Sequence, residues 1–461
     1  MTLGGGRQVR TKRLGSRGGA VVVAVLSIVG ATQAAAAGGG ASLVRDIYPG
    51  AHSSYPRYFT PLGSRALFAA VDATHGIELW RTNGTKSGTK LIRDIAPGTE
   101  NSAPYSFERV GGEVLFGAWA SRRHPSLWRS DGTRAGTKLV RNVIPSNLRA
   151  VGRRLFFTTD DPTHGEELWR SDGTRAGTKR LADIQPGRRG SFPRDLTNVN
   201  GTLFFVAQDD DHGVELWRSD GTHAGTKLVR DIVPGSGSSA PQNLLGVGRR
   251  LFFTASNAAS GYELWRSDGT RAGTNLVRDI VPGRGSSYPR DLTRVGDNFF
   301  FGAYHANLGN ELWRSDGTRA GTKLVRDIVP GAGGSFPNDF RQVGRRVFFE
   351  AGDRSHGFEL WRSNGTSAGT KLIKDLASGD ESSKPSNLRN VSGTLFFRAT
   401  DAAHGKELWR SDGTAAGTTL VRDITVGPGG SEPQYLKNFR GMLLFEAGEP
   451  THGRELWKAV P

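Results

Sequence analysis

Residues 167–174 read ELWRSDGT, and close copies of this stretch recur along the chain at a nearly fixed period. The tryptophan of the motif appears nine times, with spacings of 48, 41 and then six times 48 residues. These tryptophans are Trp80, Trp128, Trp169, Trp217, Trp265, Trp313, Trp361, Trp409 and Trp457. Self-similarity at a period of about 20–50 residues is the sequence signature of solenoids, propellers and arrays. The chain is therefore expected to contain nine copies of one unit.

Turn residues divide one such unit, residues 193–232, into four short strands. The first strand alternates and ends at Asn200-Gly201, which is a hairpin signal. A continuous apolar run, LFFVA, follows, and an Asp-Gly pair separates the third strand from the fourth. The predicted strands are 195–199, 203–207, 214–218 and 226–232. Four strands per unit without helical periodicity are typical of propeller blades, so the expected fold is an all-β propeller of nine four-stranded blades.

The two ends of the repeat region are complementary. Residues 43–47 (LVRDI) match the fourth strand of a unit that has no earlier strands, and residues 435–458 supply strands one to three without a fourth. The N-terminal strand is therefore expected to complete the last blade, which removes two exposed sheet edges and closes the ring. An open solenoid is the alternative, but its ends would be dissimilar polar capping repeats.

The first residues differ from the repeats in composition. A basic start is followed by the apolar run 20–28 (AVVVAVLSI) and by small residues at 34–37. This order is typical of a signal peptide, and the run is too short to span a membrane. We therefore expect residues 1–37 to be a signal peptide and residues 38–461 to form a single propeller without a transmembrane segment. The expected location is secreted, extracellular or in a bacterial envelope.

The motif at 167–174, with seven close copies, resembles the ELWxxDGT-repeat proteins of bacteria, which are sometimes labelled hyalin-like. The resemblance covers residues 43 to 461. It implies a secreted or cell-surface repeat protein with a propeller-like fold, and it supplies no catalytic residues. Departures from the motif are Ser126 in place of Glu, Asn83 and Asn364 in place of Asp, and Lys458 where the last motif stops.

The repeated residues have structural interpretations. The tryptophans are expected to pack between neighbouring sheets, where a large ring buries much area. The Asp-Gly and Asn-Gly pairs supply turn geometry, and their threonines are expected to bond to the same loop. Arg218 and Asp231 recur on adjacent strands, and a cross-strand ion pair between them is expected. The turns lack the alternating oxygen ligands of calcium loops, so no cofactor is expected, with calcium as the remaining alternative.

One rim is expected to carry both the crossover loops, such as 282–289, and the second-to-third strand loops, such as 161–165. Histidines and aspartates recur in the second kind of loop, where they either satisfy their own turn or hold a metal or a glycan. Repetition in most blades favours the first interpretation. These residues are Asp72, Asp160, Asp161, Asp209, Asp210, Asp211, Asp353, Asp401, His75, His164, His212, His356 and His404.

Departures from the repeat point to a candidate ligand site. The crossover loop into the third unit has lost seven residues around 144–147, and units two and six carry unusual rim residues. Units two and three are adjacent, so a lowered, basic and aromatic notch is expected there. The candidate ligand-binding residues are Trp119, Arg122, Arg123, His124, Tyr304 and His305. Drift in an unused blade would explain the same departures.

Composition limits the function classes. The chain has 461 residues, no cysteine and a formal net charge of +17, so cysteine nucleophiles and thiolate metal sites are excluded and attraction to polyanions is favoured. Serine-hydrolase, zinc-protease and phosphate-loop motifs are absent. We expect a non-catalytic binding, adhesion or structural module with a polysaccharide or an envelope protein as partner, and no nucleic acid. A glycoside hydrolase or polysaccharide lyase is the alternative, and a hydrolase would need a unique carboxylate pair.

Overall fold

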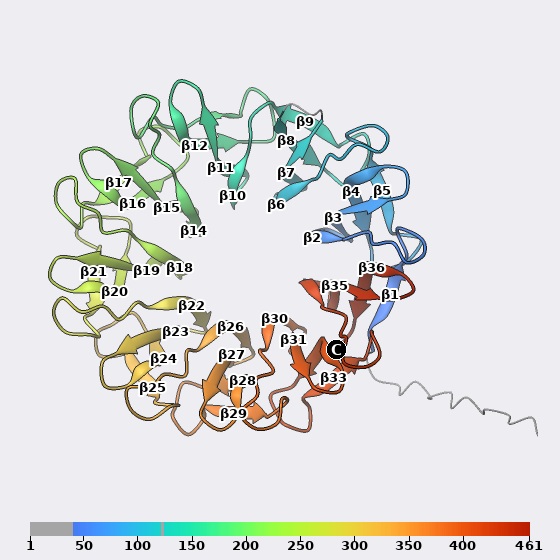
Figure 1. Ribbon diagram of the computed structural model, residues 1–461. Helices are drawn as coiled ribbons and strands as arrows, with labels where there is room; N and C mark the ends of the chain where they lie inside the picture. The colour runs from blue at the N-terminus through green and yellow to red at the C-terminus, as the bar shows by residue number, and fades with distance from the viewer. Residues whose placement is uncertain (1–39, 121–123) are drawn as a thin grey trace, which may run out of the picture. The chain divides into compact units, whose positions relative to one another are not determined.

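The computed structural model describes residues 40–120 and 124–461. The expected signal peptide at 1–37 and the candidate residues Arg122 and Arg123 lie outside the described residues. Within the described part, the strands form nine four-stranded antiparallel sheets, which follow one another around a ring (Figure 1). We call these sheets blades 1 to 9. No helix in the described ranges has the length and apolar character needed to cross a membrane.

Each blade is built in chain order from the centre of the ring outwards. Blade 1 consists of β2 (Arg57–Leu62), β3 (Arg65–Asp72), β4 (Gly76–Thr82) and β5 (Lys90–Arg93). Blade 2 consists of β6 (Tyr105–Val110), β7 (Glu113–Trp119), β8 (Pro125–Ser130) and β9 (Lys138–Arg141). Blade 3 consists of β10 (Ser146–Val151), β11 (Arg154–Asp161), β12 (Gly165–Ser171) and β13 (Lys179–Arg180). Blades 4 to 6 consist of β14 (Arg194–Val199), β15 (Thr202–Asp209), β16 (Gly213–Ser219) and β17 (Lys227–Arg230); β18 (Gln242–Val247), β19 (Arg250–Asn257), β20 (Gly261–Ser267) and β21 (Asn275–Arg278); β22 (Arg290–Val295), β23 (Asn298–His305), β24 (Gly309–Ser315) and β25 (Lys323–Arg326).

The remaining blades follow the same plan. Blades 7 and 8 consist of β26 (Asn338–Val343), β27 (Arg346–Asp353), β28 (Gly357–Ser363) and β29 (Lys371–Lys374); β30 (Ser386–Val391), β31 (Thr394–Asp401), β32 (Gly405–Ser411) and β33 (Thr419–Arg422). Blade 9 consists of β34 (Gln434–Phe439), β35 (Met442–Glu449), β36 (Gly453–Ala459) and, from the other end of the chain, β1 (Ser42–Arg45).

Local sequence explains the strands of a blade. In blade 4 the first hairpin turns at Asn200 and Gly201, whose φ angles of 50° and 88° are the left-handed pair that a tight two-residue turn requires. Val199 then pairs with Thr202. The fourth strand, β17, is shorter than the predicted 226–232 and ends at Arg230. Asp231 instead accepts a hydrogen bond from the Gly235 amide at 3.1 Å, which turns the chain into the crossover loop.

The hydrophobic core is divided into clusters at the contacts between blades. Trp361 of blade 7 packs with Phe300 and Leu312 of blade 6 and with Phe349 of its own blade. All nine motif tryptophans are buried, with exposed fractions of 3–8%. The expected position of the tryptophans between neighbouring sheets is therefore confirmed.

The N-terminal strand closes the ring, as expected. β1 pairs antiparallel with β36, and Leu43 lies opposite Trp457. Val44 and Ile47 join the cluster around Trp80, so blade 9 packs against blade 1 in the same way as any other pair of neighbours. The inner strands β2 and β34 also contact each other. The open-solenoid alternative is therefore wrong.

The expected cross-strand pair between Arg218 and Asp231 is wrong. Arg218 lies opposite Lys227, and no ion pair joins it to Asp231 in the described structure. Arginines of the motif reach the next blade instead: Arg266 donates to the Gly317 carbonyl at 3.0 Å. Motif arginines such as Arg266 are therefore inter-blade hydrogen-bond donors.

Fourth-strand arginines make a second contact between blades. Arg326 donates to the Thr370 carbonyl at 2.5 Å, and its guanidinium lies over the Trp361 ring at 5.9 Å. A cation over an aromatic face is attracted by the ring quadrupole. The arginine of the Leu-Val-Arg string in one blade therefore covers the tryptophan of the next blade, and these two repeated residues form a contact between blades.

Candidate functional site

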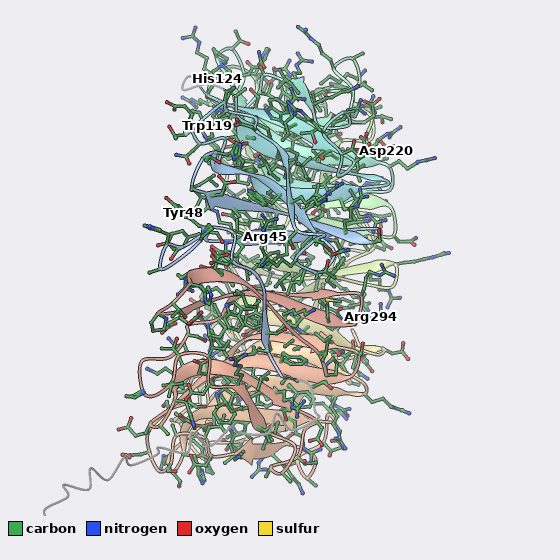
Figure 2. The ribbon with its side chains drawn as sticks, turned by 90° about the vertical axis from the view of Figure 1, so that its right-hand side faces the viewer. Arg45, Tyr48, Trp119, His124, Asp220 and Arg294 are labelled. Carbon is green, nitrogen blue, oxygen red and sulfur yellow. The ribbon has the colours of Figure 1, made fainter. Side chains whose placement is uncertain are left out.

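The two faces of the ring carry different loops. The crossover loop after blade 1 lies on the second-to-third strand hairpin of that blade, because the Ile77 amide donates to Asn101 Oδ1 at 2.7 Å and the Ala103 amide donates to the Ile77 carbonyl at 2.9 Å. The expectation that both kinds of loop share one rim is confirmed. In Figure 2, Trp119 and His124 lie on this face, and Asp220 of an Asp-Gly turn lies on the opposite face.

The rim histidines are held by their own turns. His164 Nδ1 lies 2.9 Å from Asp161 Oδ1, which also accepts hydrogen bonds from the backbone amides of Thr163 and His164. Burial alone would raise the pKa of Asp161, but its hydrogen bonds hold that pKa below the usual value. The same carboxylate–histidine contact recurs at His75, His212, His356, His404 and His452. The interpretation of the histidines, and of the aspartates that bind them, as turn elements is confirmed, whereas Asp210 contacts Gln185 and Arg189 of the crossover loop.

The aspartates of the Asp-Gly turns on the opposite face bond within their own turns. Asp172 Oδ1 accepts hydrogen bonds from the amide and the hydroxyl of Thr174, at 2.9 and 2.7 Å, and Thr174 Oγ1 accepts one from the Gly177 amide. The expected role of the threonines is confirmed. Within the described ranges, no group of three or more histidine or carboxylate side chains is placed to hold a metal ion.

The glutamate of the motif has a role that the sequence analysis missed. Glu311 is fully buried, and its carboxylate accepts hydrogen bonds from the amides of Ile328, Val329 and Ser335 and from the Ser335 hydroxyl, at 2.7–3.1 Å. The serine lies 24 residues downstream, in the crossover loop. This glutamate therefore anchors the crossover loop to its blade. A serine at this fixed distance in the other repeats is the sequence signal that would have revealed the pair.

Burial affects the protonation of these anchors. It raises the pKa of Glu78 and Glu455 to about 7, and the hydrogen bonds from their amide and serine donors act in the opposite direction. Burial also raises the pKa of the other anchor glutamates, which are Glu167, Glu215, Glu263, Glu311, Glu359 and Glu407. The folded ring therefore holds protons that the unfolded chain releases.

This proton uptake makes the stability depend on pH. Anchor glutamates with a raised pKa add stability below their unfolded value of about 4.5, and this stability is lost as the pH rises towards 7. Turn carboxylates raise the pKa of His212, His356 and His404. These histidines therefore also add stability at low pH, and this stability is lost as the pH rises above 6.5. The loss for Glu78 and Glu455 is roughly 3 kcal/mol each. We expect the denaturant midpoint of residues 38–461 to be higher at pH 5 than at pH 8.

The turn aspartates set the acidic limit of this effect. Hydrogen bonds from threonines lower the pKa of Asp172 and Asp220, so their stabilisation is present above about pH 4 and is lost below it.

A Glu78→Gln, Glu455→Gln double variant keeps an acceptor for the amides but does not titrate, and it should flatten the dependence of the denaturant midpoint on pH between pH 5 and 8. A midpoint that rises over this range would contradict the assignment.

The departure at blade 2 is a single coupled change. Ser126 replaces the anchor glutamate, and the following crossover loop is the one shortened by seven residues. Ser126 Oγ contacts Asn142 Oδ1 at 3.4 Å. A glutamate at this position would be buried without the loop donors of other blades, which is unfavourable. The short loop and Ser126 therefore have a structural explanation, independent of a ligand.

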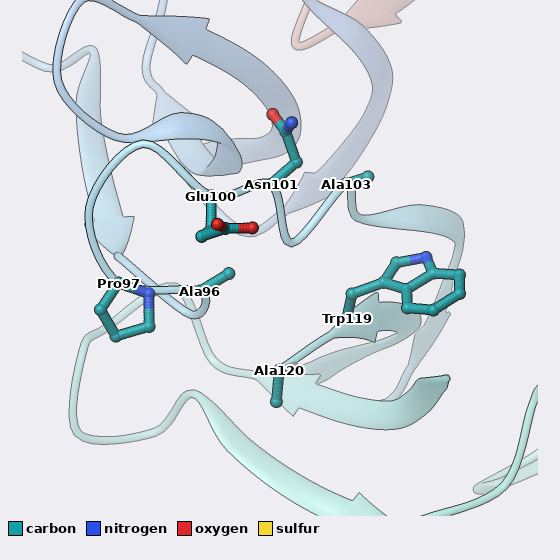
Figure 3. Close-up of a pocket in the computed structure, with 7 residues that line it drawn as sticks. All are labelled: Ala96, Pro97, Glu100, Asn101, Ala103, Trp119 and Ala120. Carbon is teal, nitrogen blue, oxygen red and sulfur yellow. The ribbon is translucent and has the colours of Figure 1, made fainter. Parts of the chain in front are cut away.

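A pocket remains beside Trp119. Its volume is about 420 Å³ and its lining is mostly apolar, with Ala96, Pro97, Glu100, Asn101, Ala103, Trp119 and Ala120 as lining residues (Figure 3). The Trp119 amide donates to the Ser102 carbonyl at 2.8 Å, which fixes the residue against the crossover loop. All ten tryptophans lie in the described ranges, and only Trp119 is not buried.

The position of this pocket differs from the expected notch. The pocket lies between the crossover loop that leaves blade 1 and the edge of blade 2, and not between blades 2 and 3. His124 is exposed, its Nδ1 lies 3.3 Å from the Pro125 carbonyl oxygen, and it is not one of the pocket residues. The long loop after blade 1 therefore forms the wall that the short loop after blade 2 cannot supply.

Tyr304 occupies in blade 6 the position that Trp119 occupies in blade 2. Its amide donates to the Ser287 carbonyl at 2.7 Å, and its ring is 41% exposed. His305 replaces the turn aspartate of other blades, and the Asn307 amide donates to His305 Nδ1 at 3.4 Å. Blades 2 and 6 are not neighbours in the ring, so Tyr304 and His305 do not belong to the Trp119 pocket.

Comparison with known proteins finds only distant structural similarity. No protein-family model matches the sequence, and no curated protein matches it. Among solved structures, a puromycin hydrolase is 14% identical, with a TM-score of 0.40 over 77% of this chain and 59% of that chain. Oligopeptidase B from Leishmania major is 11% identical, with a TM-score of 0.43 over 76% of this chain and 53% of its own. The chain thus spans less than two thirds of either protein.

A third similar structure is an isolated domain. The β-propeller domain of the Trilobed protease from Pyrococcus furiosus is 12% identical, with a TM-score of 0.39 over 70% of this chain and 98% of that chain. With TM-scores below 0.5, these similarities carry no conclusion about the activity of this chain.

Proposed function

We propose that the protein is an exported, non-catalytic binding module that holds a polysaccharide in the pocket beside Trp119. The observation that carries this proposal is the pocket itself, in which the one tryptophan that is not buried forms a wall. The volume of about 420 Å³ falls within the range of about 300–1,000 Å³ that is usual for ligand pockets. The signal-like residues 1–37 and the resemblance to ELWxxDGT-repeat proteins support a secreted or bacterial-envelope location.

The lining of the pocket suits the two-sided chemistry of a sugar ring. Figure 3 shows the Trp119 indole and the Pro97 ring on opposite sides of the pocket, with Glu100 and Asn101 above Ala96. Apolar faces of this kind accept the C–H face of a pyranose, and an amphipathic ring such as indole is favoured at such surfaces. The carboxylate and the amide are the kinds of group that bond to hydroxyls. Asn101 is held in place because its Oδ1 accepts the Ile77 amide.

Residues 38–461 should bind a subset of bacterial polysaccharides, and Trp119→Ala should weaken that binding at least tenfold, about 1.4 kcal/mol. The indole is half-buried at the edge of blade 2 and belongs to none of the core clusters, so the melting temperature should change little. The measurement is a titration of immobilised polysaccharides at low and at high salt. Salt-resistant binding would separate recognition from attraction by net charge.

Tyr304→Ala is the matched control, because Tyr304 has the same backbone position in blade 6. It should leave the affinity unchanged. Equal loss in both variants, or no loss in Trp119→Ala, would overturn the pocket as the site. Binding to an envelope protein but to no polysaccharide would replace the ligand class, and release of shortened sugars from the bound polysaccharide would favour the carbohydrate-active enzyme.

A further inference from the structure

The innermost strands of the blades surround the centre of the ring (Figure 1). Four consecutive inner strands, β22, β26, β30 and β34, carry cationic side chains. Arg294, Arg341, Arg389 and Lys437 line one pocket of about 580 Å³ there, together with side-chain amides. None of these four residues makes an ion pair within the described ranges.

The cations are a local departure from the repeat. Arg341, Arg389 and Lys437 share one register, opposite the second residue of the apolar run on the next strand of their blade. The equivalent residues on other inner strands are mostly uncharged or acidic, as at Thr60, Glu108, Thr197, Leu245 and Thr293. Three cations in succession are therefore confined to blades 7 to 9, and Arg294 of blade 6 extends them by one strand.

Backbone contacts hold two of these guanidinium groups in place. Arg341 Nε donates to the Leu388 carbonyl at 2.9 Å, and Arg389 Nε donates to the Leu436 carbonyl at 2.8 Å. Each bond reaches the next blade, so each arginine is fixed across a blade boundary while further N–H donors remain for a ligand. Asn390 and Asn438 add hydrogen bonds between blades in the other direction, because each donates to a carbonyl of the preceding inner strand.

This arrangement is electrostatically unfavourable without a counter-charge. Burial lowers the pKa of Arg341 and of Lys437, and the positive charge of Arg389 lowers both further. Asp339 and Glu108 act in the opposite direction, but neither forms an ion pair with these cations. Asp339 accepts the Leu388 amide instead, at 3.3 Å. An anion in the pocket would relieve this repulsion.

We propose that this pocket on the inner strands is a binding site for a tetrahedral oxyanion, either free phosphate or the sulfate or phosphate ester of a larger molecule. Arginine matches such groups because its planar fork can donate two parallel hydrogen bonds to their oxygens. The site is independent of the Trp119 pocket, and Figure 2 places Arg294 towards the face that carries Asp220, opposite Trp119.

The test is thermal unfolding of residues 38–461 with increasing inorganic phosphate, against chloride at equal ionic strength, with dextran sulfate as a second arm. Ligand that binds the folded state raises the melting temperature. We expect phosphate or dextran sulfate to raise it, and Arg389→Gln to weaken the response at least tenfold in concentration. A response to phosphate identifies the free anion as sufficient, and a response to dextran sulfate alone identifies an ester on a polymer.

Arg149→Gln is the matched control. Arg149 has the same register on β10 and the same Nε bond, to the Leu196 carbonyl at 2.8 Å, but it lies outside this pocket. It should lose the same inter-blade bond and keep the full response. Lys437→Gln removes a charge without removing a hydrogen bond of the described structure, and it covers the case in which Arg389→Gln does not fold. No response in the unmodified chain, or equal loss in Arg149→Gln, would overturn the proposal.

Discussion

A chain that begins at residue 49 should lose most of its stability relative to one that begins at residue 38. The deletion removes β1 and leaves the backbone of β36 without a partner along one edge. It also removes Val44 and Ile47 from the core between blades 9 and 1, at roughly 1.5–3 kcal/mol each. Glu455 loses the amides of Ile47 and Tyr48, at about 1–3 kcal/mol for each bond.

The sum, roughly 5–12 kcal/mol, is comparable with the whole stability of a typical folded protein. Urea denaturation followed by far-ultraviolet circular dichroism compares the two chains. A synthetic peptide of residues 40–48 should restore part of the loss by adding a strand to the open edge. A change in midpoint no larger than that of a surface substitution would contradict a ring that depends on β1.

Glu311→Ala should be among the most destabilising single substitutions in the chain. It leaves three backbone amides and the Ser335 hydroxyl buried around an empty volume. Unsatisfied buried donors and the cavity together should cost about 3–5 kcal/mol. The crossover loop into blade 7 should also become accessible to a protease before the ring unfolds.

Blade 2 supplies the control for this substitution. Ser126 stands at the anchor position, and within the described part of the chain its hydroxyl has only a long contact with Asn142. Ser126→Ala should therefore change the free energy of unfolding by less than about 1 kcal/mol. Equal effects of Glu311→Ala and Ser126→Ala in the same urea titration would show that the glutamates do not hold the crossover loops.

The sequence was sufficient for the fold because one local solution is repeated nine times. The Asn-Gly and Asp-Gly pairs mark turns whose left-handed residues are present in the structure, and the apolar run before each motif marks a buried strand. The ring closure followed from residues 43–47 and 435–458, since two incomplete sets of strands add up to one blade. The fourth strand differs most from the prediction, since β17 ends at Arg230 where Asp231 turns the chain into the crossover loop.

Contacts between blades were not predictable in the same way. Arg218 and Asp231 are near in sequence and recur together, yet motif arginines such as Arg266 bond to a carbonyl 51 residues away. Glu311 finds its serine 24 residues downstream in a loop that has no regular structure. The hydrogen-bond partner of each side chain depends on how neighbouring blades and their loops pack, and the sequence pattern within one repeat does not predict that packing.

The candidate site was predicted in part. Trp119 and Tyr304 were recognised as departures from the repeat, but their equivalence became visible only from the shared bond to the serine carbonyl. The pocket lies on the blade 1 side of Trp119, because the wall comes from a loop of ordinary length. The cations on the inner strands were missed, although Arg341, Arg389 and Lys437 follow one another at intervals of 48 residues and therefore occupy the same register in blades 7 to 9.

The measurement that tests the proposed function most directly is a fluorescence titration of residues 38–461 with the polysaccharide that binds best. Nine tryptophans are buried in the core, so a ligand in the pocket should change the emission of Trp119 alone. We expect a saturable spectral change in the unmodified chain and none in Trp119→Phe. A change of the same size in Trp119→Phe, or no change while the polysaccharide is bound, would contradict it.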